Sequence, residues 1–593
     1  MRLTNVAHLR LPFGRLMGYD VTVSEPGAVL PVSFDQRRHV GAGERGGSWM
    51  ALSFRLTDSV GLDELAAAWL AVIARHGTLR TVFTPGSDDE PELADVEISA
   101  GEWIEHPVAP GEAVNDALRD VLDRTCTPYS RPSHRLCVLE TAAGPTIVVA
   151  ADHSHVDMWS MLLILRDFLA ALGRVEAGEA SGLDEVPPFV AHTRALRERA
   201  AAPDDVRRRW AEIIDDSGGV MPLFPLPLGT ADPHEERVEV RDVFDVDDSA
   251  AFSAQARDDG VSTLALAVAA MTAVTAEMAD APLRAVFPVH SRYDDTWHDS
   301  VGWFITNSVL ESTVAEPRAA SAAVREAVRL GSWPLDDVLA PWGGMPEAPG
   351  MFAISWLDLR RLPVRVDAAG LGAQYVGATI RTDGVMLWFI LDGSGLHLRC
   401  RYPDTPEART NVGGWLDRLV ATLQAGARSS VGGVLVNRDG ETFRVQRATR
   451  ADVPAIVGLL LDDRIGATRE VAEYAPYEAA YDVVARDRSH YLAVVRADDG
   501  RVVGTMQLTV LPGLSRRGTT RLQIEGLRVA RADRSRGLGT AMLTWAHAHG
   551  RSHGATLAQV TTDETRERAR EFYARLGYTA NHVGLKRDLA PPP

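Results

Sequence analysis

His153 and Asp157 lie four residues apart in the segment VVAADHSHVDMWSM, between an apolar run that predicts a strand and an amphipathic run that predicts a helix. A strand-to-helix connection holds polar side chains on a fixed framework. A neutral imidazole at such a place can accept a proton from an attacking amine or hydroxyl, so His153 is a candidate general base. The alternative is a histidine that bonds a backbone carbonyl, with Asp157 capping the helix.

A second segment, RVARADRSRGLGTAM, has the spacing of an anion-binding turn. A predicted strand ends near Val529, and the turn over 534–539 leads directly into a helix. Glycines let a ligand approach the backbone closely, and the free amides at a helix start point at anionic oxygens. Glycine-rich turns can also serve packing alone. The motif therefore indicates an anion-binding site only if neighbouring segments match such a site as well.

The elements that must position His153 are predicted in two stretches of the chain with similar hydrophobic patterns. Apolar periodicity predicts helices over 62–80 and 158–172 and strands over 135–139 and 146–151. Residues 201–237 mix charge with proline and glycine and indicate a crossing between two halves. The second half repeats the pattern, with helices predicted at 262–278, 319–328 and 407–425 and strands at 283–289 and 386–390.

The elements around the glycine-rich turn belong to a separate unit. Residues 426–442 become rich in glycine, serine and polar side chains, and the charge balance changes sign after them. From Phe443 onward there are 23 Lys and Arg against 17 Asp and Glu, whereas the residues before it hold 39 against 63. Strands are predicted at 442–449, 491–496, 502–511, 521–529, 555–561 and near 583–587, with helices from 452 and over 537–550 and 566–576.

Composition excludes several classes of protein. The 593 residues carry a net charge of −18, which disfavours a nucleic-acid partner because that affinity depends on cations meeting phosphates. No apolar run reaches the roughly 18 residues of a membrane span, and no signal-peptide pattern is present. The three cysteines lack metal-ligand spacing, so neither a disulfide framework nor a metal site is expected. We therefore expect a cytoplasmic protein without a membrane partner.

The segment around His153 resembles the HHxxxDG motif of the condensation-domain superfamily, which includes the condensation domains of peptide synthetases. Four further segments match that family in order: SFDQRRHV at 33–40, RHGTLRTVF at 75–83, HSR at 290–292 and VGWFITNSV at 301–309. The resemblance covers about residues 28–430. It implies an α/β (α+β) fold of two chloramphenicol-acetyltransferase-like halves in a V, over 28–215 and 216–430, preceded by an arm at 1–27.

The condensation resemblance assigns roles to individual residues. His153 takes the place of the working histidine in a tunnel between the halves, and Asp157 pairs with Arg292 to hold the loop. Asn307 supports the tunnel floor, although a capping or turn asparagine is an equal alternative. Asp152 replaces the motif's first histidine, and Met158 replaces its glycine and is expected to narrow the acceptor side.

The glycine-rich turn resembles motif A of the GCN5-related N-acetyltransferases (GNAT), with a unit at 443–590 after a linker at 431–442. AREFYARLGY at 569–578 resembles the family's AxxFYxxLGF ending. The resemblance implies that acetyl-CoA or another acyl-CoA is the co-substrate. Its pantetheine arm would bond the backbone of Leu527 and Val529, and its phosphates would be held by Arg534, Arg536, Gly537, Gly539 and Thr540.

Two residues are candidates for proton transfer in the GNAT unit. Tyr573 would return a proton to the CoA thiolate, which is otherwise a poor leaving group; the alternative is a packing tyrosine. Glu525 would deprotonate an amine through a water, since a carboxylate of ordinary pKa is a weak base.

Together these resemblances predict a bifunctional acyltransferase of natural-product biosynthesis. The first module would form an amide or ester from an acyl thioester brought by a separate carrier protein, with a small amine or hydroxyl as acceptor. The second would move an acyl group from CoA to an amine. Two alternatives stay open: a non-catalytic condensation-like module that presents a carrier-bound substrate to an active acetyltransferase, and a condensation enzyme regulated by a CoA-sensing GNAT unit.

Overall fold

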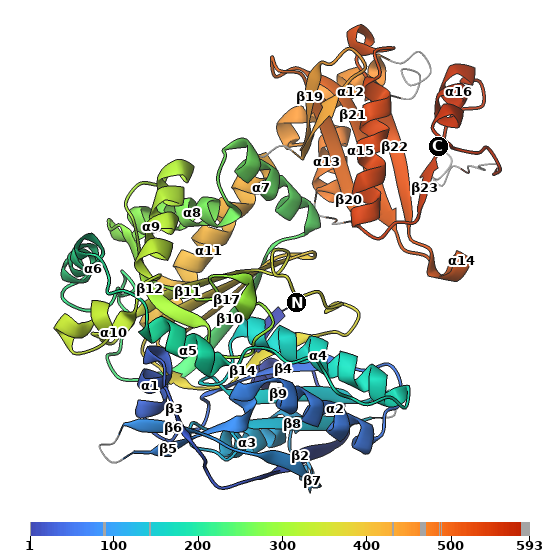
Figure 1. The fold of residues 1–593 in the computed structure, drawn as a ribbon. Coiled ribbons are helices and arrows are strands. Elements are labelled where there is room, and N and C mark those ends of the chain that lie inside the picture. Colours follow the sequence, from blue (N-terminus) through green and yellow to red (C-terminus); the bar gives the residue numbers. More distant parts are fainter. Residues whose placement is uncertain are drawn as a thin grey trace. The chain divides into compact units, whose positions relative to one another are not determined.

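A computed structural model describes residues 2–86, 90–141, 144–429, 432–462, 470–471, 473–485, 487, 489–582 and 587. The chain folds into two compact units (Figure 1). The first unit comprises Met1–Val243 and Val261–Thr422, and the second comprises Phe244–Gly260 and Leu423–Pro593. The second unit is therefore discontinuous in sequence, because it includes a segment from the middle of the chain.

The first unit is built on two seven-stranded sheets. In spatial order, the first contains β1 (Arg2–Asn5), β14 (Gln374–Gly377), β4 (Trp49–Arg55), β9 (Thr146–Asp152), β8 (His134–Glu140), β2 (Arg15–Val23) and β7 (Ile98–His106). The second contains β12 (Ile305–Ser312), β11 (Leu283–His290), β13 (Phe352–Asp358), β16 (Val385–Asp392), β17 (Gly395–Pro403), β10 (His234–Phe244) and β15 (Arg381–Thr382). A small sheet contains β3 (Val29–Leu30), β6 (Pro91–Asp95) and β5 (Thr81–Pro85).

Helices cover these sheets and supply much of the core. They are α1 (Phe34–Gly41), α2 (Leu62–Arg75), α3 (Val114–Thr125), α4 (Met158–Glu176), α5 (Phe189–Arg197), α6 (Asp204–Asp216), α8 (Thr263–Ala279), α9 (Pro317–Leu330), α10 (Leu335–Val338) and α11 (Pro406–Ser429), the last of which runs into the second unit. Helices α2 and α4 pack together over the first sheet. Both carry apolar side chains at helical spacing, so one face of each is buried.

The two halves of the first unit are interleaved. Strand β14 comes from the second half of the sequence, yet it lies between β1 and β4 in the first sheet. Residues 1–27 do not form the expected arm, because residues 15–23 form β2, whose Leu16, Met17 and Tyr19 are buried in the sheet. The boundary expected at 27 therefore falls between two strands of the same unit, whereas the one expected at 215 separates the strands of the two large sheets except for β14.

The second unit has one six-stranded sheet, with all neighbours antiparallel except its last pair. In order it contains β18 (Gly433–Val436), β19 (Thr442–Arg447), β20 (His490–Arg496), β21 (Val502–Leu511), β22 (Arg521–Val529) and β23 (Leu557–Val560). Its helices are α7 (Val246–Asp258), α12 (Val453–Leu461), α13 (Ala475–Val484), α14 (Ser515–Gly518), α15 (Leu538–Ser552) and α16 (Glu567–Arg575).

Most predicted elements of both units are present, and the differences have local causes. The helix expected over 62–80 ends at Arg75, and Gly77–Arg80 continue as a 3-10 turn. Part of the expected linker at 431–442 is strand β18, which pairs with β19. The strand expected near 583–587 falls largely outside the described residues.

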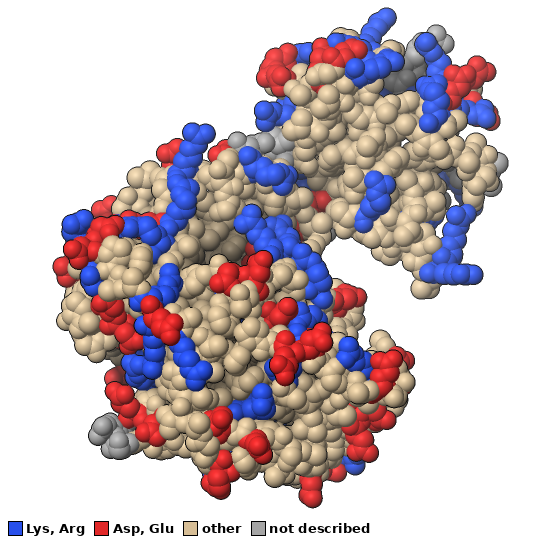
Figure 2. Space-filling view, viewed as in Figure 1, with Lys and Arg blue, Asp and Glu red and all other residues tan. Residues whose placement is uncertain are grey.

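Surface charge is mixed on the face that Figure 2 displays, where acidic and basic side chains of the first unit are interspersed. Among the described residues, no helix combines the length and apolar character that crossing a membrane requires.

Candidate functional site

His153 lies in the turn between the buried strand β9 and helix α4. Its amide donates to the Ser48 carbonyl at 3.0 Å, which fixes the backbone of the turn. The imidazole packs on Trp303, with ring centroids 4.2 Å apart, and its buried Nδ1 has no hydrogen bond to another residue of the described chain. Burial, together with the nearby His39, lowers the pKa of His153, so the ring is neutral near pH 7 and can accept a proton.

Asp157 and Arg292 form a fully buried ion pair, as the sequence predicted. Two hydrogen bonds of 2.8 and 3.3 Å join them, and both side chains are excluded from solvent. Asp157 also caps α4 by accepting from the Ser160 amide at 2.7 Å and accepts from the Phe304 amide at 3.1 Å. Burial opposes ionisation, but Arg292 and Ser160 outweigh it and hold the pKa of Asp157 below its usual value. Asp157 therefore has both of the roles considered for it: it caps helix α4, and it pairs with Arg292.

Arg292 reaches this position from the end of β11 and is clamped there. Its guanidinium donates to the Ser160 hydroxyl at 2.9 Å and to the Ser300 carbonyl at 3.1 Å. It also lies over the Trp159 and Phe304 rings, at 4.7 and 4.0 Å from their centroids. The pair therefore ties the His153 turn of the first sheet to loops of the second sheet.

Asn307 does not contact the His153 turn directly. On β12, its side-chain amide donates to Asp35 of α1 at 3.3 Å. Burial raises the pKa of Asp35 to about 6. The next residue of α1, Gln36, donates to the Ser154 carbonyl at 2.9 Å, so α1 connects Asn307 to the turn that carries His153.

Asp152 and His39 form a pair that the sequence analysis missed. The buried Asp152 carboxylate accepts from His39 Nε2 at 3.2 Å and from the hydroxyls of Ser48 and Ser154. Burial opposes its ionisation, but these donors hold the pKa of Asp152 well below its usual value. Arg45 donates to the other nitrogen of His39 at 3.0 Å. Two features of the sequence could have indicated this pair when taken together. Asp152 stands where the HHxxxDG motif has its first histidine, and His39 directly follows the SFDQRR element.

Met158, which was expected to narrow the acceptor side, has its side chain buried in the core cluster to which α2 and α4 both contribute. Its carbonyl accepts from the Tyr375 hydroxyl at 2.7 Å, so strand β14 braces the first turn of α4.

The candidate CoA site of the second unit lies where β22 extends beyond its pairing with β23. Pairing of β22 with the parallel strand β23 ends at Ile524, whereas β22 continues to Val529. A bulge opposite Met506 accompanies Gly526, whose φ is 59°, a conformation that favours glycine. The backbone of Leu527 and Val529 therefore lies beyond the last pairing with β23, as a ligand arm requires.

The turn after β22 brings the predicted phosphate-binding residues to the start of α15. Gly537 has a φ of 90° and precedes the first helical residue, and a Cβ there would lie 3.0 Å from the Arg438 amide nitrogen. At Gly539 an added Cβ would meet Phe572 at 3.5 Å, and Thr540 is exposed on the first turn. The small residues thus keep the helix start accessible.

The two predicted phosphate-binding arginines are ion-paired in this structure. Arg534 donates to Asp462 at 2.9 Å, and Arg536 donates to Asp439 and Glu441 at 2.8 and 2.6 Å. Exposed pairs of this kind are weak, so an anionic ligand can displace the carboxylates.

Tyr573 and Glu525 occupy different environments. Tyr573 on α16 is partly buried beside Phe572 and Tyr578, and burial raises its pKa despite Arg528 and Arg566. A raised pKa keeps the phenol protonated, as a general acid requires. Glu525 is exposed on β22.

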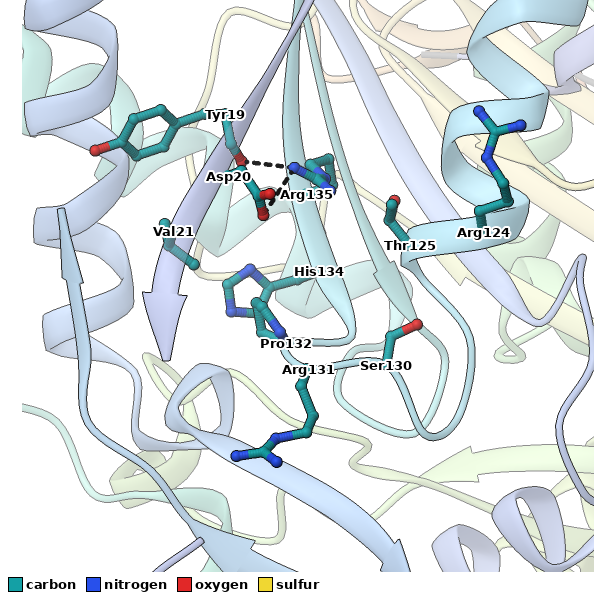
Figure 3. Close-up of a pocket in the computed structure, with 10 residues that line it drawn as sticks. All are labelled: Tyr19, Asp20, Val21, Arg124, Thr125, Ser130, Arg131, Pro132, His134 and Arg135. Atoms are coloured by element: carbon teal, nitrogen blue, oxygen red, sulfur yellow. Dashed lines mark hydrogen bonds and ion pairs between the residues drawn. The ribbon is translucent and has the colours of Figure 1, made fainter. Parts of the chain in front are cut away.

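A pocket of about 280 Å³ lies elsewhere in the first unit, between β2, the end of α3 and the start of β8 (Figure 3). Tyr19, Arg131 and His134 are among its lining residues. None of the predicted site residues lines this pocket, so it is separate from the His153 turn.

Comparison with protein families matches both parts of the chain. Residues 35–329 match the condensation-domain family, and residues 459–578 match the acetyltransferase (GNAT) family. The acyltransferase PapA3 of Mycobacterium tuberculosis is 24% identical over 431 residues, which cover 68% of this chain and 90% of PapA3.

Solved structures share the fold of the first part. The PapA2 acyl transferase is similar with a TM-score of 0.64 at 17% identity, covering 72% of this chain and all of that one. The first condensation domain of the calcium-dependent antibiotic synthetase gives a TM-score of 0.53 at 16% identity, covering 68% of this chain and 98% of that domain. The predicted α/β architecture is thereby confirmed.

Proposed function

Because this chain joins a condensation domain to a GNAT-family acetyltransferase domain and is an acyltransferase, we propose that it carries out two acyl transfers with separate sites. In the first, His153 removes a proton from an amine or hydroxyl as that group attacks an acyl thioester. A carbon–nitrogen or carbon–oxygen bond forms, the carbon–sulfur bond breaks, and the proton leaves with the thiol. The observation that carries this proposal is the neutral, partly buried imidazole on a turn held by the Asp157–Arg292 pair.

The second transfer uses an acyl-CoA, with acetyl-CoA as the simplest donor. The end of β22, which extends beyond its pairing with β23, is suited to bond the pantetheine arm through Leu527 and Val529. The start of α15 offers Gly537, Gly539 and Thr540 to the phosphates. Glu525 takes a proton from the acceptor amine through a water, and Tyr573 gives one to the departing thiolate.

The donor for His153 is proposed to be an acyl or peptidyl group on a separate carrier protein, in lipid or peptide biosynthesis of natural products. The acceptor is a small amine or hydroxyl compound. The alternative is a first module that only docks a carrier-bound substrate for the acetyltransferase.

Titration of the whole chain with acetyl-CoA by calorimetry tests the second site without knowledge of the acceptor. We expect binding in the micromolar range that disappears in Gly537→Glu, since the new carboxylate would repel the phosphates. Binding by neither protein would refute the CoA site.

Product formation from carrier-bound thioesters tests the first site. We expect His153→Ala to abolish the product and Glu525→Gln to leave it unchanged. Undiminished product with His153→Ala would leave only the docking alternative for this module.

A further inference from the structure

Three side chains of the second unit converge on one point, although one of them comes from the middle of the chain. Asp247 lies on the first turn of α7, whereas His549 and His553 lie four residues apart at the end of α15. Oδ1 of Asp247 is 3.2 Å from Nδ1 of His549 and 3.2 Å from Nε2 of His553. Residues four apart on a helix share a face, so α15 presents both imidazoles to α7.

The hydrogen bonds around the cluster orient the imidazole nitrogens for coordination. His553 Nδ1 lies 2.8 Å from the His549 carbonyl oxygen, which can only accept, so this nitrogen carries a proton. In the neutral ring, Nε2 then directs its lone pair toward the common point. Arg447 donates to the other oxygen of Asp247 at 2.9 Å. Outer hydrogen bonds of this kind are typical of metal-ligating histidines and carboxylates.

The spacing matches a tetrahedral ion of the zinc type. With ligand bonds of about 2.0–2.1 Å, neighbouring ligands lie about 3.3 Å apart. The two measured separations are 3.2 Å, and the three ligand atoms all lie within 4.8 Å of one another. The side chains are between 7% and 17% exposed, so the ligands are largely shielded but the site can be reached from solvent.

Local charge also favours a cation. Asp245 caps α7 two residues before Asp247, so two carboxylates and one guanidinium, that of Arg447, lie around the cluster. Because metal ligands must be deprotonated, protons compete with a metal for these side chains.

We propose that Asp247, His549 and His553 bind one divalent zinc-type ion, with water at the fourth position, and that this ion fastens α7 to α15 within the second unit. No metal was predicted from the sequence, because the three cysteines lack metal-ligand spacing and these three ligands form no short motif. The ligand from α7 is far from α15 in sequence, and folding brings them together.

Zinc uptake by the full chain tests the proposal. Protein freed of metal by a chelator is titrated with Zn²⁺ at pH 7.5 in competition with a chromophoric chelator. We expect one equivalent to bind with a micromolar or lower Kd, and His553→Gln or Asp247→Asn to weaken binding at least tenfold. His547→Gln is the matched control, because His547 lies on the same helix but bonds Tyr578.

A second measurement guards against variants that fail to fold. Co²⁺ in place of Zn²⁺ should give the visible absorption bands of four-coordinate cobalt in the parent chain and in His547→Gln. His553→Gln should lack these bands, although its circular dichroism spectrum shows that it is folded like the parent chain. Absence of stoichiometric uptake, or equal affinity in all four proteins, would overturn the proposal and leave a proton-mediated Asp247–His553 pair.

Discussion

Replacing Arg292 by methionine tests whether the buried ion pair holds the catalytic turn. Both side chains are wholly excluded from solvent, so Arg292→Met leaves the Asp157 carboxylate buried without its counter-charge. Breaking such a pair costs about 3–5 kcal/mol. Asp157 keeps the amides of Ser160 and Phe304 at 2.7 and 3.1 Å, so we expect the lower end, about 3 kcal/mol.

Urea unfolding of the full chain, followed by tryptophan fluorescence, measures this loss. Trp159 reports on the site because its ring centroid lies 4.7 Å from the Arg292 guanidinium. The double variant Asp157→Asn/Arg292→Met removes both charges, so its cost should fall below the sum of the single costs by about 1–3 kcal/mol. Additive costs, or a loss below about 1 kcal/mol for Arg292→Met, would refute the argument.

The stabilisation that the Asp157–Arg292 pair gives to the fold depends on pH. The folded-state pKa of Asp157 lies below its ordinary value, so the pair stabilises the fold above the unfolded-state pKa. That contribution is lost as the pH falls through the folded-state pKa. The difference in unfolding free energy between the parent chain and Asp157→Asn should therefore shrink in acid.

Three other substitutions give distinct outcomes. Tyr573→Phe should lower CoA-dependent turnover by about 10²-fold while acetyl-CoA affinity, measured by calorimetry, stays the same; unchanged turnover would favour the CoA-sensing alternative. Asp35→Asn should raise the unfolding free energy at pH 8 by up to about 3 kcal/mol but not at pH 4. Burial raises the pKa of Asp35 to about 6, so ionisation of this carboxyl at higher pH destabilises the fold. An equal effect of the substitution at both pH values would contradict this. Gly537→Ala should weaken acetyl-CoA binding, since alanine is strained at a φ of 90° and its Cβ meets Arg438; an unchanged Kd in calorimetry would show that the turn tolerates the change.

Local pattern was sufficient for most elements, and apolar periodicity located α4 and β9. The pairing of Asp157 with Arg292 came from the resemblance to the condensation family and not from local pattern. The role of Asp152 was missed, because its partner His39 lies on a different element and only a joint comparison of the two motif segments connects them.

Long-range assembly accounts for the remaining differences. Strand β14 is only four residues long, and its place between β1 and β4 depends on pairings across several hundred residues. Helix α7 is an ordinary amphipathic segment, and nothing in its own sequence assigns it to the second unit. Such choices depend on which surfaces remain to be buried once other elements have packed.

The position of β14 has a consequence for synthesis on the ribosome. Strand β1 emerges first, but in the first sheet its neighbour is β14, whose residues 374–377 are translated much later. At about 5–20 residues per second, the edge of β4 waits roughly 15–60 s for that strand. During this time β4 presents an open edge to other chains, so nascent protein should depend on chaperones more than the finished fold suggests.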